Sequence, residues 1–156
     1  MEKSLVVYFS ASGRTRTVAE RLARIAGADL YEIVPEVKYT SADLNYMNKK
    51  SRSSVEMNDR SSRPAIVNTD AHIADYSIIY LGFPIWWYVA PTIVNTFLEK
   101  YDFTGKKIVL FATSGGSNFG KAILNLRDSV AKTTEVIEGK VFRGKVSDEE
   151  LESILI

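Results

Sequence analysis

Residues 5–15 of this chain are LVVYFSASGRT, and they indicate its fold. The first five form a continuous apolar run with β-branched and aromatic members, which is typical of a strand buried on both faces of a parallel sheet. Polar residues interrupt the run, and Val18, Leu22 and Ile25 then recur at helical spacing until Gly27 ends the pattern. The stretch therefore predicts a strand, a polar loop and a helix in succession.

The same alternation continues along the chain. Apolar runs predict further strands at residues 30–34, 77–82, 107–112 and 135–141, and helical patterns occupy residues 92–100, 122–130 and the segment that follows Ser147. Strands alternating with helices indicate an α/β fold, a doubly wound five-stranded parallel sheet. Residues 36–75 show no clear period, and we expect a long irregular connection there with a helix around residues 42–50. In sheets of this kind ligands bind at the carboxyl ends of the strands.

The composition excludes several classes of function. Lys and Arg number 20 against 19 Asp and Glu, and the net charge of +1 argues against nucleic acid as a partner, because phosphate neutralisation needs a basic surplus. The chain has no cysteine, which excludes disulfides, thiol catalysis and iron–sulfur clusters. With His72 as the only histidine we expect no metal site. The length of 156 residues predicts one domain, residues 1–156.

One stretch is long enough to cross a membrane. Residues 76–98 contain no charge, but Gly82, Pro84 and Pro91 interrupt them, so we expect a buried strand, a turn and a helix instead of a membrane span. The apolar run at residues 5–9 is too short for a secretory signal. We therefore expect a cytoplasmic protein with no membrane partner.

Three loops follow predicted strands, and each carries residues suited to a ligand. The first, residues 10–15, brings hydroxyls and backbone N–H groups to the start of a helix, where the dipole favours an anion such as phosphate. It is also compatible with an ordinary capped turn in which Ser12 is the helix N-cap. The second, residues 84–88, has three consecutive aromatic residues that cannot all face one core, so at least one ring is expected at the cleft, where it can stack on a flat heterocycle. The third, residues 113–120, has two adjacent glycines that allow close approach of backbone to a ligand.

Together these segments resemble the flavodoxin-like family, in particular its small flavodoxin branch, over nearly the whole chain. The resemblance rests on residues 5–15, 82–87 and 111–117, and also on residues 36–46. It implies non-covalent FMN, with the phosphate on the first loop and the isoalloxazine ring between the other two. The cofactor-binding residues that it implies are Ser10, Ala11, Ser12, Gly13, Arg14, Thr15, Pro84, Ile85, Trp86, Trp87, Thr113, Ser114, Gly115 and Gly116. It implies no catalytic residue.

Two departures from the family pattern bear on function. Flavodoxins that carry electrons are usually strongly acidic, whereas this chain has a charge of +1. They usually also place a tyrosine in the third of these loops to cover one flavin face; here Gly115 and Gly116 stand there, and Phe119 is the one candidate substitute. We expect an electron carrier that serves unknown redox partner proteins. The alternative is an NAD(P)H-dependent quinone or nitro reductase on the same fold, which an open flavin face would suit. A phospho-acceptor receiver domain is disfavoured, because no acidic cluster follows the first strand.

Overall fold

Five parallel strands form one sheet at the centre of the molecule. The computed structural model describes residues 3–67, 69–86, 89–114, 116 and 118–156. The strands are β1 (Ser4–Tyr8), β2 (Asp29–Glu32), β3 (Ile78–Pro84), β4 (Lys107–Thr113) and β5 (Glu135–Phe142), and their order across the sheet is β2-β1-β3-β4-β5. Every neighbouring pair is parallel. The predicted doubly wound five-stranded sheet is thus confirmed.

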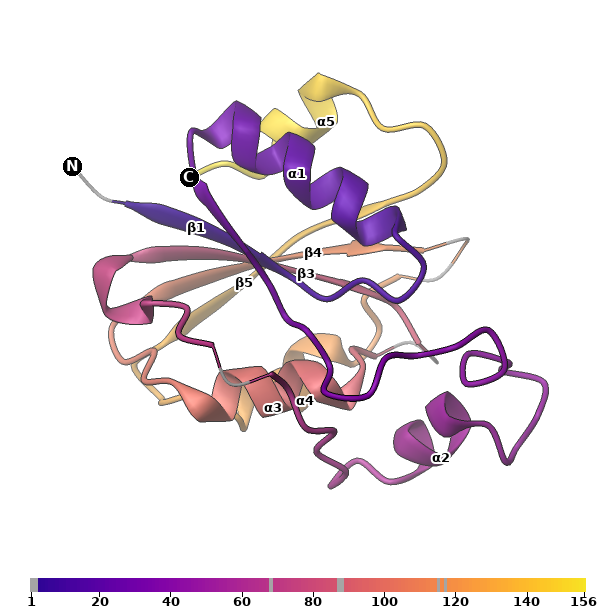
Figure 1. Cartoon of the computed structure of the whole chain (residues 1–156). Helices are drawn as coiled ribbons and strands as arrows, with labels where there is room; N and C mark the ends of the chain where they lie inside the picture. Colours follow the sequence, from indigo (N-terminus) through magenta and orange to yellow (C-terminus); the bar gives the residue numbers. More distant parts are fainter. Residues whose placement is uncertain (1–2, 68, 87–88, 115, 117) are drawn as a thin grey trace.

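Helices cover both faces of this sheet, which is why its central strands are apolar on both sides. Helices α1 (Arg14–Ala26) and α5 (Asp148–Glu152) lie over one face, and α3 (Thr92–Lys100) and α4 (Ala122–Arg127) lie over the other (Figure 1). The two faces have separate cores. Val6 and Tyr8 of β1 pack toward α1, whereas Leu5 and Val7 face the opposite way and pack in the core beneath α3.

Local sequence signals determine the ends of several helices. Gly27 caps α1 in the left-handed conformation, with φ of 64°, and α3 begins directly after Pro91 as expected. The hydroxyl of Ser147 accepts a hydrogen bond from the Glu150 N–H at 3.2 Å, so the predicted N-cap of α5 is present. Helix α4 ends at Arg127 and is shorter than the pattern over residues 122–130 predicts.

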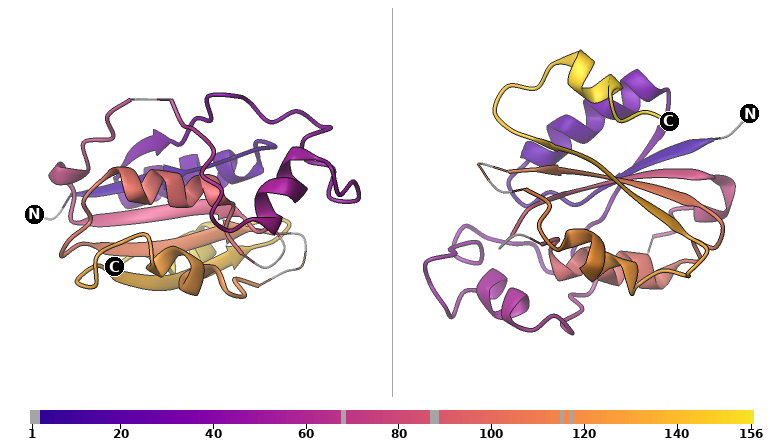
Figure 2. Two further views of the ribbon diagram at one scale, coloured as in Figure 1. Left: turned by 90° about the horizontal axis from the view of Figure 1, so that it is seen from below. Right: turned by 180° about the vertical axis from the view of Figure 1, so that it is seen from behind.

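The predicted helix at residues 42–50 is wrong. This segment forms turns, because the side-chain oxygens of Asn45 and Asn48 accept the backbone N–H groups of Met47 and Lys50, two residues further on. The helix of this connection is instead α2 (Arg52–Asn58), which begins where Ser51 accepts from the N–H of Ser54. Figure 2 shows α2 set apart from the layers that cover the sheet, on the side where the strands have their carboxyl ends.

The uncharged stretch at residues 76–98 folds as expected, into β3, a loop and α3. Within the described ranges, no helix has both the length and the apolar character needed to cross a bilayer.

Candidate functional site

The three loops predicted to bind a ligand meet at the carboxyl edge of the sheet. Tyr8 at the end of β1 pairs with Gly82, and Pro84 at the end of β3 pairs with Thr113 at the end of β4. Two further hydrogen bonds continue this pairing into the loops, from the Phe9 N–H to the Gly82 carbonyl at 3.0 Å and from the Ile85 N–H to the Thr113 carbonyl at 3.1 Å. The topology therefore places residues 10–15, 84–86 and 113–114 side by side.

The first loop has the backbone geometry of an anion site. Gly13 has φ of 93° and is the N-cap of α1, so the assignment of Ser12 as N-cap is wrong. The hydroxyl of Ser10 accepts the Gly13 N–H at 3.0 Å and fixes the turn. The first hydrogen bond within the helix runs from the Thr17 N–H to the Gly13 carbonyl, so the N–H groups of the residues between them have no acceptor inside the helix. Such groups at a positive helix end suit a phosphate.

The side chains of the first loop differ in whether they are available to bind a ligand. The Ser12 side chain is exposed, and its hydroxyl bonds to no residue in the part of the chain that the structure describes. The Arg14 guanidinium donates to the Gly144 carbonyl at 3.4 Å, which draws it toward the loop before α5. Ala11 is half-buried and packs against the core. Ser12 thus offers an exposed hydroxyl to a ligand, and the Ser10 hydroxyl, which accepts the Gly13 N–H, still has a proton to donate.

Thr15 and Thr113 join the first and third loops. Their hydroxyl oxygens are 2.7 Å apart, and both residues are buried. The Thr15 hydroxyl was expected on the phosphate; in the structure it has a partner on β4. This contact ties the start of α1 to the end of the sheet.

We expect Thr15→Val to lower the free energy of unfolding by about 1–2 kcal/mol, because valine keeps the shape but leaves the buried Thr113 hydroxyl without its partner. The double variant Thr15→Val/Thr113→Val should lose less than the sum of the two single variants, since neither hydroxyl is then orphaned. Urea unfolding of the wild-type protein, Thr15→Val, Thr113→Val and the double variant measures these free energies. Additive losses would show that the two hydroxyls do not interact.

The second loop follows directly from β3, and its described residues are Pro84, Ile85 and Trp86. Trp86 and Val89 exchange two backbone hydrogen bonds, at 3.0 and 3.1 Å. The Trp86 ring is half-buried and meets Phe9 and Tyr39 edge-on. The prediction that one aromatic ring of this loop lines the cleft also involved Trp87 and Tyr88, which lie outside the described residues.

In the third loop, Ser114 makes the two hydrogen bonds that define its described part. The Ser114 N–H donates to the Phe142 carbonyl at 3.2 Å, and the Ser114 hydroxyl accepts the Gly116 N–H at 3.1 Å. A Cβ at Gly116 would meet nothing within 4 Å, so its backbone is open to a ligand. Gly115 lies outside the described residues. Phe119 is not a covering ring: it is 5% exposed and packs in the core against Phe83.

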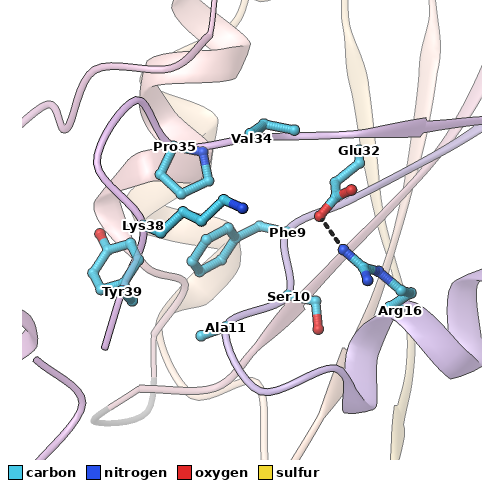
Figure 3. A pocket seen from close by; sticks show the side chains of 9 residues that line it. All are labelled: Phe9, Ser10, Ala11, Arg16, Glu32, Val34, Pro35, Lys38 and Tyr39. Atoms are coloured by element: carbon cyan, nitrogen blue, oxygen red, sulfur yellow. Dashed lines mark hydrogen bonds and ion pairs between the residues drawn. The ribbon is translucent and has the colours of Figure 1, made fainter. Parts of the chain in front are cut away.

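The structure also shows a cavity that the sequence did not indicate. It measures about 190 Å³ and lies on the β2 side of the first loop, as Figure 3 shows. Its walls are Phe9, Ser10, Ala11, Arg16, Glu32, Val34, Pro35, Lys38 and Tyr39. Arg16 and Glu32 form an ion pair of 2.7 Å at one end. The sequence signal that could have pointed to it is Tyr39, an aromatic residue that follows soon after the second predicted strand.

Comparison with known proteins defines the class. Residues 3–155 match the family model described as flavodoxin. The chain therefore belongs to the flavodoxin family, as its resemblance implied.

Solved structures agree with this assignment. A candidate flavoprotein from Bacteroides eggerthii DSM 20697 is 44% identical, with a TM-score of 0.90 over 97% of this chain and 94% of that one. Another from Bacteroides uniformis ATCC 8492 is 43% identical, with a TM-score of 0.90 over 97% and 96%. A flavoprotein from Lactobacillus acidophilus NCFM, solved in complex with FMN, is 22% identical with a TM-score of 0.74 over 99% of both chains, and shares the fold. A search of curated proteins gave no significant match.

Proposed function

We propose that this flavodoxin binds FMN non-covalently and passes electrons between partner proteins. The observation that carries the proposal is the first loop, where the N–H groups at the start of α1 that have no acceptor within the helix, and the Ser12 hydroxyl, form one anion site beside two further loops. One such site suits the single terminal phosphate of FMN. When bound, FMN supplies the electron-transfer chemistry, and the protein supplies binding and orientation.

The residues at the sheet edge fit the parts of this cofactor. The first loop holds the phosphate through backbone N–H groups and Ser12. Pro84, Ile85, Trp86 and Trp87 contact the ribityl chain and the ring. In the third loop, Ser114, Gly115 and Gly116 meet the pyrimidine edge, and the open space at Gly116 supports close approach there. No side chain needs to act as an acid or a base, because electron transfer requires neither.

The partners follow from the chemistry and the charge. With a net charge of +1, the chain has no strong acidic field to guide basic partners, so we propose that it docks on redox proteins mainly by shape and local contacts. The alternative, reduction of a quinone by NAD(P)H, has one supporting observation, the burial of Phe119 away from the site. We also propose that the protein works in the cytoplasm, which cell fractionation checks.

We expect the purified protein to be yellow and to release FMN, not FAD, on acid treatment, as chromatography of the released flavin shows. We also expect NADPH alone to leave the bound flavin oxidised over seconds, because a carrier has no nicotinamide site. Recovery of FAD, or no flavin after reconstitution with FMN, would contradict the proposed cofactor. Rapid bleaching by NADPH followed by turnover of a quinone would establish the reductase instead.

A further inference from the structure

Three aromatic rings form a closed triangle behind the second loop. The ring centroids of Phe9 and Tyr39 are 5.6 Å apart, those of Phe9 and Trp86 are 5.9 Å apart, and those of Tyr39 and Trp86 are 5.5 Å apart. All three contacts are edge-on, the arrangement that aromatic pairs favour. Phe9 belongs to the core, and Trp86 belongs to the loop that contacts the flavin ring in the proposed function. Tyr39 comes from neither.

Tyr39 is held from behind by α2. Its hydroxyl donates to the Glu56 carboxylate at 2.5 Å, and the Arg52 guanidinium lies 3.8 Å above the centre of its ring. Arg52 also donates to Glu56 at 2.9 Å. The Arg52 and Glu56 side chains are 21% and 14% exposed, so water screens these contacts little. Burial and the neighbouring Glu56 carboxylate raise the pKa of the Tyr39 hydroxyl, which therefore stays a donor.

The same connection also holds the far end of the second loop. The Arg60 guanidinium donates to the Ala90 carbonyl at 3.1 Å, and the hydroxyls of Ser62 and Thr92 are 2.8 Å apart. Tyr39 thus contacts Trp86, and Arg60 and Ser62 contact Ala90 and Thr92. These contacts restrict the positions that Trp86, Ala90 and Thr92 can adopt.

We propose that Tyr39, locked by Arg52 and Glu56 of α2, is a positioning residue that sets the orientation of Trp86 and thereby the environment of the flavin ring. The proposal rests on the proposed function, since it assigns Trp86 to the ring-binding loop. It gives the connection between β2 and β3 a role in the site. Although Tyr39 also lines the cavity beside the first loop, its ring contacts are with Phe9 and Trp86, so its effect is on the ring side of the cofactor.

The test compares FMN and riboflavin binding by Tyr39→Leu, Tyr39→Phe and the wild-type protein. Because Tyr39→Leu removes two ring contacts, we expect it to weaken binding of both flavins by a similar factor of about 3- to 10-fold. We also expect a shift in the reduction potential of bound FMN and in its visible spectrum. Tyr39→Phe keeps the ring and should recover part of the affinity. Tyr46→Leu is the matched control, because Tyr46 is 73% exposed and makes no ring contact with a described residue.

The proposal would be overturned if Tyr39→Leu kept the wild-type affinities for both flavins, the wild-type reduction potential and the wild-type visible spectrum. A loss of affinity for FMN alone, with riboflavin binding unchanged, would overturn it too. If Tyr39→Leu does not fold, Tyr39→Phe and Glu56→Gln test the same contact through the affinity for riboflavin. We expect each to weaken binding and the double variant to add little, and unchanged affinity in both single variants would overturn the proposal. Failure of the wild-type protein to bind either flavin would instead refute the proposed function and remove the basis of this inference with it.

Discussion

Replacing Ser12 by alanine is expected to weaken FMN binding about 10- to 100-fold, since a hydrogen bond to a charged group is worth about 1.5–3 kcal/mol. The reason lies in the geometry of the first loop. The Ser10 hydroxyl accepts the Gly13 N–H and keeps its proton, and the buried Thr15 hydroxyl pairs with Thr113, whereas the Ser12 side chain is exposed and can donate its proton to a phosphate oxygen without giving up a contact within the described residues. The affinity is measured by titrating flavin with the apoprotein and monitoring the quenching of the flavin fluorescence.

Riboflavin separates a phosphate contact from a change of loop shape. It lacks the phosphate, so its affinity should change less than twofold in Ser12→Ala. Ser153→Ala is a suitable control, because Ser153 bonds to the Glu150 carbonyl on α5 and should leave both affinities as they are. Equal losses for FMN and riboflavin would show that Ser12 shapes the site without contacting phosphate. The Tyr39 variants are expected to give that equal pattern, so the two sets of variants distinguish the two ends of the cofactor.

Replacing Gly82 by valine is expected to lower the free energy of unfolding by about 3 kcal/mol, among the larger costs of overpacking a core. Gly82 lies in β3 between Tyr8 and Phe111, and a Cβ built on it would lie 2.1 Å from the Phe111 ring. Phe111 is fully buried and packs on Phe142, so its ring has little room to move away. Chemical denaturation of the apoprotein gives the loss.

A second substitution tests whether the clash is the cause. Phe111→Leu removes the ring atoms nearest to Gly82, so the double variant Gly82→Val/Phe111→Leu should be more stable than the sum of the two single changes predicts. If the losses of unfolding free energy in the two single variants simply add in the double variant, the loss in Gly82→Val has a cause other than the contact with Phe111. Because Gly82 precedes the second loop by only two residues of β3, Gly82→Val should also weaken flavin binding in whatever fraction remains folded.

The sequence by itself was sufficient for the framework of the molecule. Continuous apolar runs such as residues 5–9 are local signals of strands buried on both faces. The starts of α3, after Pro91, and of α5, after Ser147, are likewise indicated by residues within the first turn of each helix. Once the strands are parallel, their carboxyl ends share one edge, so the meeting of the three loops follows from topology alone. For this reason the fold and the meeting of the three loops could be predicted before any contact was known.

Only the tertiary structure decided how individual side chains are used. Thr15 and Thr113 are 98 positions apart in sequence, and no local pattern indicates that their hydroxyls pair. The sequence offers Phe119 as a ring that could cover one flavin face, but in the structure this ring packs in the core against Phe83. In the connection between β2 and β3, the Glu56 carboxylate of α2 accepts from Tyr39, whose ring packs edge-on against Trp86, 47 positions further along the chain. Such choices depend on which distant groups become neighbours, because a hydroxyl or a ring is satisfied by the nearest partner in space and not by the nearest in sequence.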